Sequence, residues 1–144
     1  AGSQDMTSLY EKGVRAIWEN ASGTNRSFLT FENAGHNAAA PMPAPAESFR
    51  DDERLGFNVS AHYTDPVWNQ ARMNNIAQHF VSAWMDLYLK GNETAGEYLD
   101  LVENSNDGVW SMNEDGTPKE DHSYWKGFAK DSAKGLRFEV KAPE

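Results

Sequence analysis

The sequence predicts an α/β fold, and three features support that prediction. An amphipathic helix over residues 7–19 is followed after a short turn by an apolar strand over residues 27–32. A helix in that position is half of a crossover between parallel strands, so a second strand is expected just before Ala1. A long helix after residue 65, with apolar side chains at helical spacing, then supplies an element to cover the sheet.

Composition limits the classes of partner that we expect. The chain has 144 residues with 39% hydrophobic and 12% aromatic side chains, which suffices for the core of one domain. A net charge of -9 opposes binding to a phosphate backbone, so no nucleic-acid partner is expected. The absence of cysteine excludes disulfides and a thiolate nucleophile. No apolar run approaches the roughly 20 residues that a membrane-spanning helix needs, so no membrane partner is expected either.

The first helix and the strand after it are defined by periodicity and by their boundaries. Ser8 and Glu11 have the spacing of a capping box, and Asn20 to Gly23 form the stop signal. The apolar stripe of the helix consists of Met6, Leu9, Tyr10, Val14, Ile17 and Trp18. Residues 27–32 then alternate and are rich in strand-forming side chains, whereas the turn-prone residues 33–37 cannot continue the strand.

Residues 38–64 are expected to form an irregular excursion over the surface. Three prolines fall within residues 41–45, and a polar stretch follows. A loop of this length in a compact domain is usually functional or mobile. A proline-rich recognition ligand is the alternative, and the absence of basic flanks disfavours it.

The clearest local signal is the start of the long helix. Asp65 is expected as its N-cap and Pro66 as its first residue, and Gly91 ends the run. A shorter helix is expected over residues 93–102. A short extended piece is expected over residues 135–140.

Two side chains, Asp5 and His36, are the candidates for chemistry. His36 directly follows the expected strand, and Asp5 stands at the carboxyl end of the strand expected before Ala1. Parallel strands would bring both to one edge of the sheet, which is the geometry that a general base and its orienting carboxylate require. The alternatives are that Asp5 only caps the first helix and that the backbone satisfies His36.

Other kinds of site are not indicated. The chain has no G-x-S-x-G nucleophile elbow and no glycine-rich phosphate loop. A divalent metal site from His122, Asp121 and Asp115 is conceivable but lacks a recognisable ligand spacing, so no metal is expected.

At the level of motifs, the chain resembles the α/β-hydrolases, in particular their dienelactone hydrolase-like branch. Residues 1–5 before a helix, and residues 28–37, which read Phe-Leu-Thr-Phe-Glu-Asn-Ala-Gly-His-Asn, are similar to the last two core strands of that family. Residues 63–80 are similar to the helix that follows the histidine, and residues 125–128 with 135–139 to its C-terminal ending. The resemblance implies that residues 1–144 are the C-terminal portion of a single α/β-hydrolase domain, with its last parallel strands and packing helices and a proline-rich excursion at 38–64.

That resemblance also implies a function. The family places a serine, an acid and a histidine in that order along the chain, so Asp5 and His36 would be the acid and base of a catalytic triad. The nucleophilic serine would lie on a missing upstream portion of the same protein, and the chain alone is expected to be inactive. The implied substrate is a small carboxylic ester or lactone, with Phe49 and Phe57 as apolar contacts and no cofactor. The alternative is a non-catalytic binding or structural module derived from the same fold, in which Asp5 and His36 would lie apart and face solvent.

Overall fold

The computed structural model describes residues 1–38, 40, 42–50, 52–100, 115, 125–128 and 133–144. The longer elements are β1 (Arg26–Phe31), α2 (Gln70–Tyr88) and β2 (Leu136–Lys141). A short helix near the N-terminus begins as a π-helical turn, Glu11–Arg15, and continues as α1 (Ala16–Asn20). Short 3-10 turns cover Ala46–Phe49, Glu53–Leu55, Val59–Tyr63 and Glu93–Tyr98.

The sheet differs from the predicted one, and the expected fold class is wrong. β1 pairs along its whole length with β2, and the two strands are antiparallel, with Arg26 opposite Lys141 and Phe31 opposite Leu136. In the described residues, parallel pairing is confined to the isolated bridge between Gly2 and Phe31. An α/β-hydrolase C-terminal portion requires neighbouring parallel strands, so this two-stranded sheet corresponds to another fold.

The physical reason for the error lies in what strand patterns encode. The alternation in residues 27–32 and the extended character of residues 135–140 both predicted strands, and both strands form within one residue of the expected bounds. Alternation specifies which face of a strand is buried, but it does not specify the partner strand or its direction. The predicted crossover assumed a partner before Ala1, whereas the partner along β1 comes from the end of the chain.

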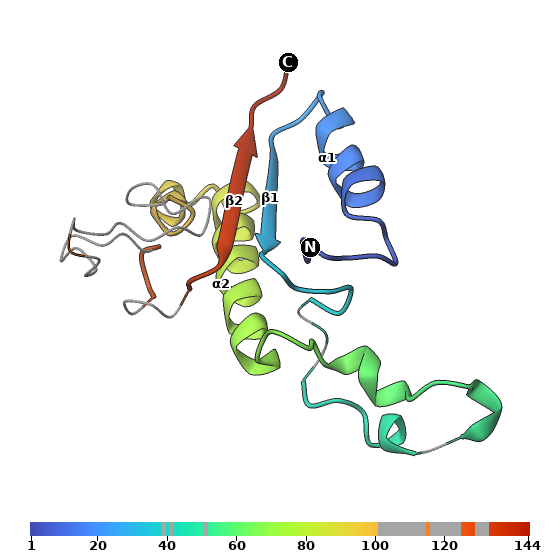
Figure 1. Ribbon diagram of the computed structural model, residues 1–144. Helices are drawn as coiled ribbons and strands as arrows, with labels where there is room; N and C mark the ends of the chain where they lie inside the picture. The colour runs from blue at the N-terminus through green and yellow to red at the C-terminus, as the bar shows by residue number, and fades with distance from the viewer. Residues whose placement is uncertain (39, 41, 51, 101–114, 116–124, 129–132) are drawn as a thin grey trace.

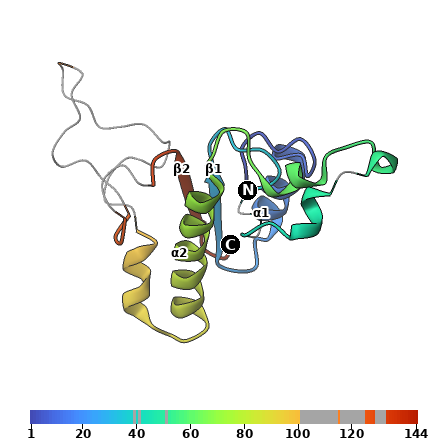
Figure 2. The ribbon, with the colours of Figure 1, turned by 90° about the horizontal axis from the view of Figure 1, so that it is seen from below.

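Helices cover both faces of the small sheet. Figure 1 shows α1 beside one face and α2 crossing behind the other, and Figure 2 shows the two strands between them. On the α1 side, the Phe28 ring packs between Tyr10 and Trp18, with centroid distances of 5.8 and 5.5 Å. On the α2 side, one larger cluster forms the core; its members include Phe31, Trp68, Met73, Ile76, Phe80, Trp125, Leu136 and Phe138.

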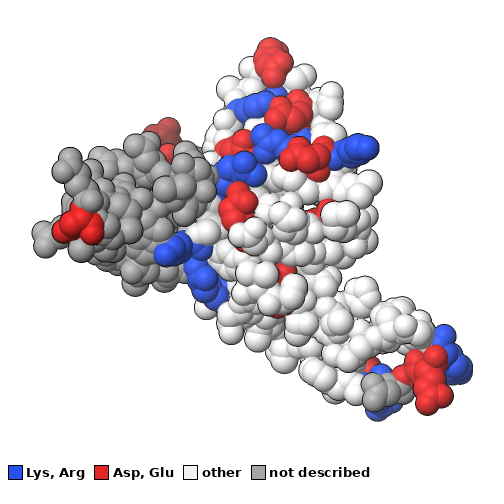
Figure 3. Space-filling model, viewed as in Figure 1, with Lys and Arg blue, Asp and Glu red and all other residues white. Residues whose placement is uncertain are grey.

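Ion pairs tie the π-helical turn and α1 to the C-terminal half of β2. Arg15 forms a two-pronged contact with Glu139, at 2.8 and 3.0 Å, and Lys141 pairs with Glu19. Figure 3 shows the resulting mixture of acidic and basic side chains over this end of the molecule. These pairs connect residues distant in sequence, so they help to fix the C-terminal strand beside the N-terminal helix.

The remaining helices lie where they were predicted, but their bounds, caps or helix types differ. The helix expected over residues 7–19 begins only at Glu11, and the one expected over 93–102 is a 3-10 turn that ends at Tyr98. The long helix begins at Gln70, with Asn69 as its N-cap, because Asp65 caps a separate turn ahead of it. Among the described residues, no helix combines the length and the apolar character needed to cross a bilayer.

Met73 tests the core beneath α2. Its side chain is fully buried, so Met73→Ala is expected to lower the free energy of unfolding by about 2–5 kcal/mol, through lost burial and the cavity left behind. Met85 lies on the same helix and is 47% exposed, so Met85→Ala should cost less than about 1 kcal/mol. Urea unfolding of both variants measures the difference, and equal losses would contradict the position of α2 on the sheet.

Candidate functional site

The structure brings Asp5 and His36 into contact. The Nδ1 atom of His36 lies 3.1 Å from each carboxylate oxygen of Asp5. The Asp5 side chain is only 6% exposed, whereas that of His36 is 41% exposed. A buried carboxylate therefore holds one nitrogen of an imidazole that is partly exposed.

Asp5 is placed by the turn that precedes the first helical segment. Its Oδ1 atom accepts hydrogen bonds from the backbone N–H groups of Thr7 and Ser8, both at 2.9 Å. Burial acts to raise the pKa of Asp5, but the hydrogen bonds from Ser8, His36 and Thr7 outweigh it and hold the pKa below its ordinary value. Asp5 is consequently ionised at neutral pH and acts only as an acceptor.

His36 is placed by a loop that packs directly on the N-terminal turn. The Gln4 N–H donates to the Ala34 carbonyl at 2.9 Å, and the Ser3 hydroxyl accepts from the Asn33 N–H at 2.7 Å. Gly2 makes this approach possible, because a Cβ at that position would lie 2.1 Å from the Gly35 carbonyl oxygen. Any side chain at Gly2 would push the two turns apart and separate Asp5 from His36.

The contact with Asp5 decides the protonation of the neutral His36 ring. A carboxylate can only accept, so Nδ1 must carry the proton that joins the two groups. In the neutral imidazole this leaves Nε2 as a free acceptor. The ring contacts found among the described residues, to Asp5 and to the Ser8 hydroxyl at 3.4 Å, all involve Nδ1. Nε2 is thus the nitrogen of the neutral His36 ring that can take up a proton.

The predicted substrate contacts, Phe49 and Phe57, lie elsewhere. Both are on the arm formed by residues 42–50 and 52–64, which projects away from the sheet in Figure 1, and they are 69% and 55% exposed. The Phe57 ring meets the edge of His62 at 5.2 Å, and within the described residues no ring contact joins either phenylalanine to His36. Their role in substrate binding stays a prediction.

A pocket of about 460 Å³ lies beside the N-terminal turn. It is lined by Asp5, Met6, Leu9, Lys12 and Arg137 among others, but His36 is not part of its wall. The pocket therefore borders the carboxylate of the pair and not the imidazole.

Metal binding finds no further support in the described part of the chain. There, no three His, Asp or Glu side chains gather closely enough to hold an ion. Two residues of the conceivable metal site, Asp121 and His122, lie outside the described residues.

Comparisons with known proteins leave the family open. The chain matches no family model, no curated protein and no solved structure. The resemblance to α/β-hydrolases therefore stays a prediction from short motifs, and the functional case depends on the geometry of Asp5 and His36.

Sequence reasoning missed three contributors to this site. Ser8 was interpreted only as a capping residue, Asp65 only as a helix cap, and Gly2 only as part of a turn. Asp65 does cap the turn ahead of α2, but the predicted capping role of Ser8 is wrong. The Ser8 N–H donates to Asp5 Oδ1, and the helical segment that begins at Glu11 has Tyr10 at its N-cap without a side-chain cap hydrogen bond. The contacts of Ser8 with His36 and of Asp65 with Gly35 had no separate signal in the sequence. The close approach at Gly2 could have been suspected from a glycine in a turn beside a candidate acid.

The pH dependence of stability should report the ionised state of Asp5. Its pKa is lowered on folding, so its contribution is complete above the unfolded pKa of about 3.9 and is lost as the pH falls through the folded pKa. Asp5→Asn removes this contribution. The difference in the free energy of unfolding between wild type and variant, measured with urea, should therefore be larger at pH 7 than below about pH 3. Asp100→Asn, at an exposed carboxylate, is the control. A gap for Asp5→Asn that does not change with pH would contradict the prediction.

Proposed function

We propose that this chain supplies the acid and base of a serine-type hydrolase acting on carboxylic ester or lactone bonds. In this proposal His36 is the general base, Asp5 is its orienting carboxylate, and the nucleophilic serine belongs to an upstream part of the same protein. The substrate is a small ester, and the chemistry needs no cofactor.

One observation supports the proposal most directly, namely that Asp5 engages Nδ1 of His36, on a side chain that is 41% exposed and whose hydrogen bonds within the described residues all involve Nδ1. In acyl transfer by a serine, the imidazole takes the hydroxyl proton on one nitrogen while a carboxylate holds the other. His36 Nε2 would accept the proton as the serine oxygen attacks the carbonyl carbon. It would then return that proton to the leaving alcohol, while Asp5 stabilises the imidazolium.

A purely structural role for Asp5 accounts for only part of its contacts. Oδ1 serves both backbone N–H groups of the turn, as a capping residue would. Oδ2 makes no such contact in the described residues and lies 3.1 Å from His36 Nδ1. The binding-module alternative expected these two groups to be separate and solvated, and the contact between them disfavours it.

Among the described residues, Ser8 is the one serine whose hydroxyl is in contact with His36, and its position does not suit a nucleophile. Its Oγ is 3.4 Å from Nδ1, the nitrogen that already carries a proton for Asp5. Because Nδ1 already carries a proton, it cannot accept another from the Ser8 hydroxyl. The proposal therefore requires a different serine at Nε2.

A serine-directed probe tests the proposal. The complete protein, meaning this chain together with its proposed upstream part, is treated with a fluorophosphonate, digested, and analysed by mass spectrometry. We expect one labelled serine outside residues 1–144, with a labelling rate that falls by at least about a hundredfold in His36→Ala. His79→Ala is the control, because it removes an imidazole from α2 that contacts Phe128 and the Tyr98 carbonyl.

The position of the label and its dependence on His36 support or reject the proposal. A single upstream label that depends on His36 but not on His79 supports the proposed triad. Labelling of Ser8 would reject the upstream nucleophile. An unlabelled protein, or labelling that is indifferent to His36, would reject the function.

A further inference from the structure

Asp65 connects the His36 loop to the segment ahead of α2. Its Oδ2 atom accepts the Gly35 N–H at 2.7 Å. Its Oδ1 atom accepts the N–H groups of Val67 and Trp68 at 2.9 and 2.8 Å. Each oxygen of one carboxylate therefore serves a different segment, and hydrogen bonds to an ionised acceptor are stronger than neutral ones.

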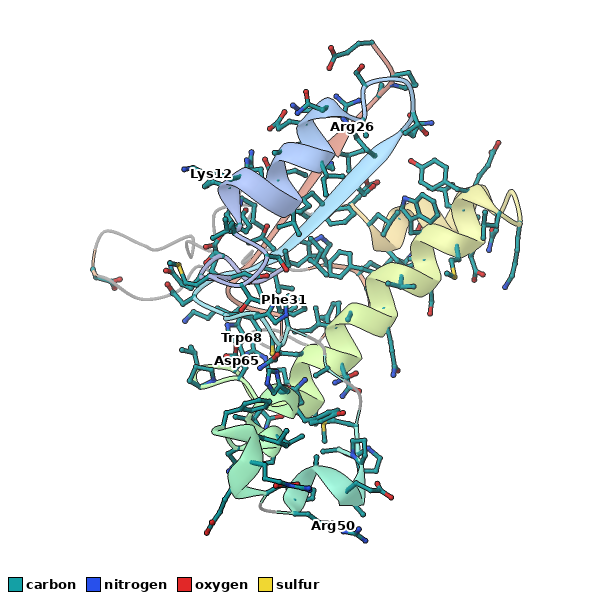
Figure 4. The ribbon with its side chains drawn as sticks, turned by 90° about the vertical axis from the view of Figure 1, so that its right-hand side faces the viewer. Lys12, Arg26, Phe31, Arg50, Asp65 and Trp68 are labelled. Carbon is teal, nitrogen blue, oxygen red and sulfur yellow. The ribbon has the colours of Figure 1, made fainter. Side chains whose placement is uncertain are left out.

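Trp68 secures the opposite end of the same loop. Its indole N–H donates to the Glu32 carbonyl at 2.8 Å, and its ring meets that of Phe31 edge-on at 5.2 Å. Figure 4 shows Phe31, Trp68 and Asp65 following one another at the end of β1. The residues between Glu32 and Gly35 are thus held at both ends by a short stretch that precedes α2.

This attachment matters because Asp5 alone does not fix the His36 backbone. Asp5 holds the ring at Nδ1, but the ring can keep this contact only while the backbone that carries it stays within reach of Asp5. The peptide N–H fixed by Asp65 belongs to Gly35, the residue directly before His36. The loop also includes Asn33 in a left-handed conformation, with φ of 62°, which a free loop would leave readily.

We propose that Asp65 is a positioning residue for His36, holding the Gly35 N–H so that the imidazole stays on Asp5 with Nε2 directed outward. The hydrogen bonds that Asp65 makes within the described residues all go to backbone N–H groups and not to the ring, so its effect passes through the loop. The catalytic consequence rests on the proposed function, whereas the effect on the ring can be measured without turnover.

Asp65→Asn separates the two roles of the carboxylate. An asparagine can keep its oxygen on the Val67 and Trp68 N–H groups, since Asn caps such turns well. Its NH2 group would then face the Gly35 N–H, and two donors cannot bond. Asn69→Ala is the matched control, because Asn69 caps α2 through the Arg72 N–H at 3.0 Å and is not bonded to Gly35.

Two readouts in the complete protein test the proposal. Nitrogen-15 NMR of the histidine ring reports whether His36 keeps its proton on Nδ1. In Asp65→Asn we expect a mixture of tautomers, and a kcat for p-nitrophenyl acetate lower by about tenfold to a hundredfold with KM changed less than about threefold. Asn69→Ala should keep the wild-type ring signals and kcat even where it lowers the unfolding temperature.

The outcomes distinguish this inference from the proposed function. Wild-type ring signals in Asp65→Asn would overturn the positioning role, whatever happens to kcat. Altered ring signals with unchanged kcat would support the positioning role and reject the hydrolase function. If the variant does not fold, hydrogen exchange in the wild type decides. A protected Gly35 amide supports the inference, and an amide that exchanges as fast as an open loop overturns it.

Discussion

Replacing His36 by alanine is expected to lower ester turnover by the complete protein by roughly 10⁴-fold to 10⁶-fold. The variant keeps the carboxylate and the loop but has no group that can take the serine proton. The side chain is 41% exposed, so its removal leaves little cavity and the thermal unfolding midpoint should change by only a few degrees. Initial rates with p-nitrophenyl acetate, measured beside circular dichroism, separate the two effects.

A histidine elsewhere in the protein serves as the comparison. His79 packs against Phe128 at 4.3 Å and bonds the Tyr98 carbonyl, so His79→Ala should cost stability and spare turnover. If His36→Ala retains more than about a tenth of the wild-type turnover, His36 is not the base, because general-base catalysis contributes about 10²-fold or more.

The local elements of the fold were predictable, and their assembly was not. Period-two alternation identified β1, and helical spacing with a terminal glycine identified α2. The pairing of β1 with β2 joins residues more than a hundred positions apart, and nothing in the six residues of either strand selects the other. The parallel sheet was inferred from chain order, and the antiparallel pairing overturned it.

The contact between Asp5 and His36 was predicted, although the parallel sheet from which it was inferred is wrong. Asp5 and His36 were placed together by assuming two full parallel strands, whereas in the structure the Gly2–Phe31 bridge and hydrogen bonds such as that from Gln4 to Ala34 join the two turns that carry them. A contact between two turns thus takes the place of the assumed sheet. The support from Asp65 depends on how α2 approaches the loop, which is a tertiary outcome that no local pattern encodes.

Asp5→Asn is the sharper test of mechanism, because it should preserve the fold and move the proton of the imidazole from Nδ1 to Nε2. The new amide oxygen can still accept the Thr7 and Ser8 N–H groups, so the turn is kept. Its NH2 group then faces Nδ1 of His36, which must become the acceptor, and the ring proton moves to Nε2.

An imidazole with its proton on Nε2 cannot take one from a serine there, so kcat should fall by about 10⁴-fold, nearly as far as in His36→Ala. Nitrogen-15 NMR should show the proton on Nε2 in the variant and on Nδ1 in the wild type. Because the acid and base act as one unit, the double variant Asp5→Asn with His36→Ala should be hardly slower than His36→Ala alone. Losses that multiply in the double variant would mean that Asp5 serves turnover by some route other than His36.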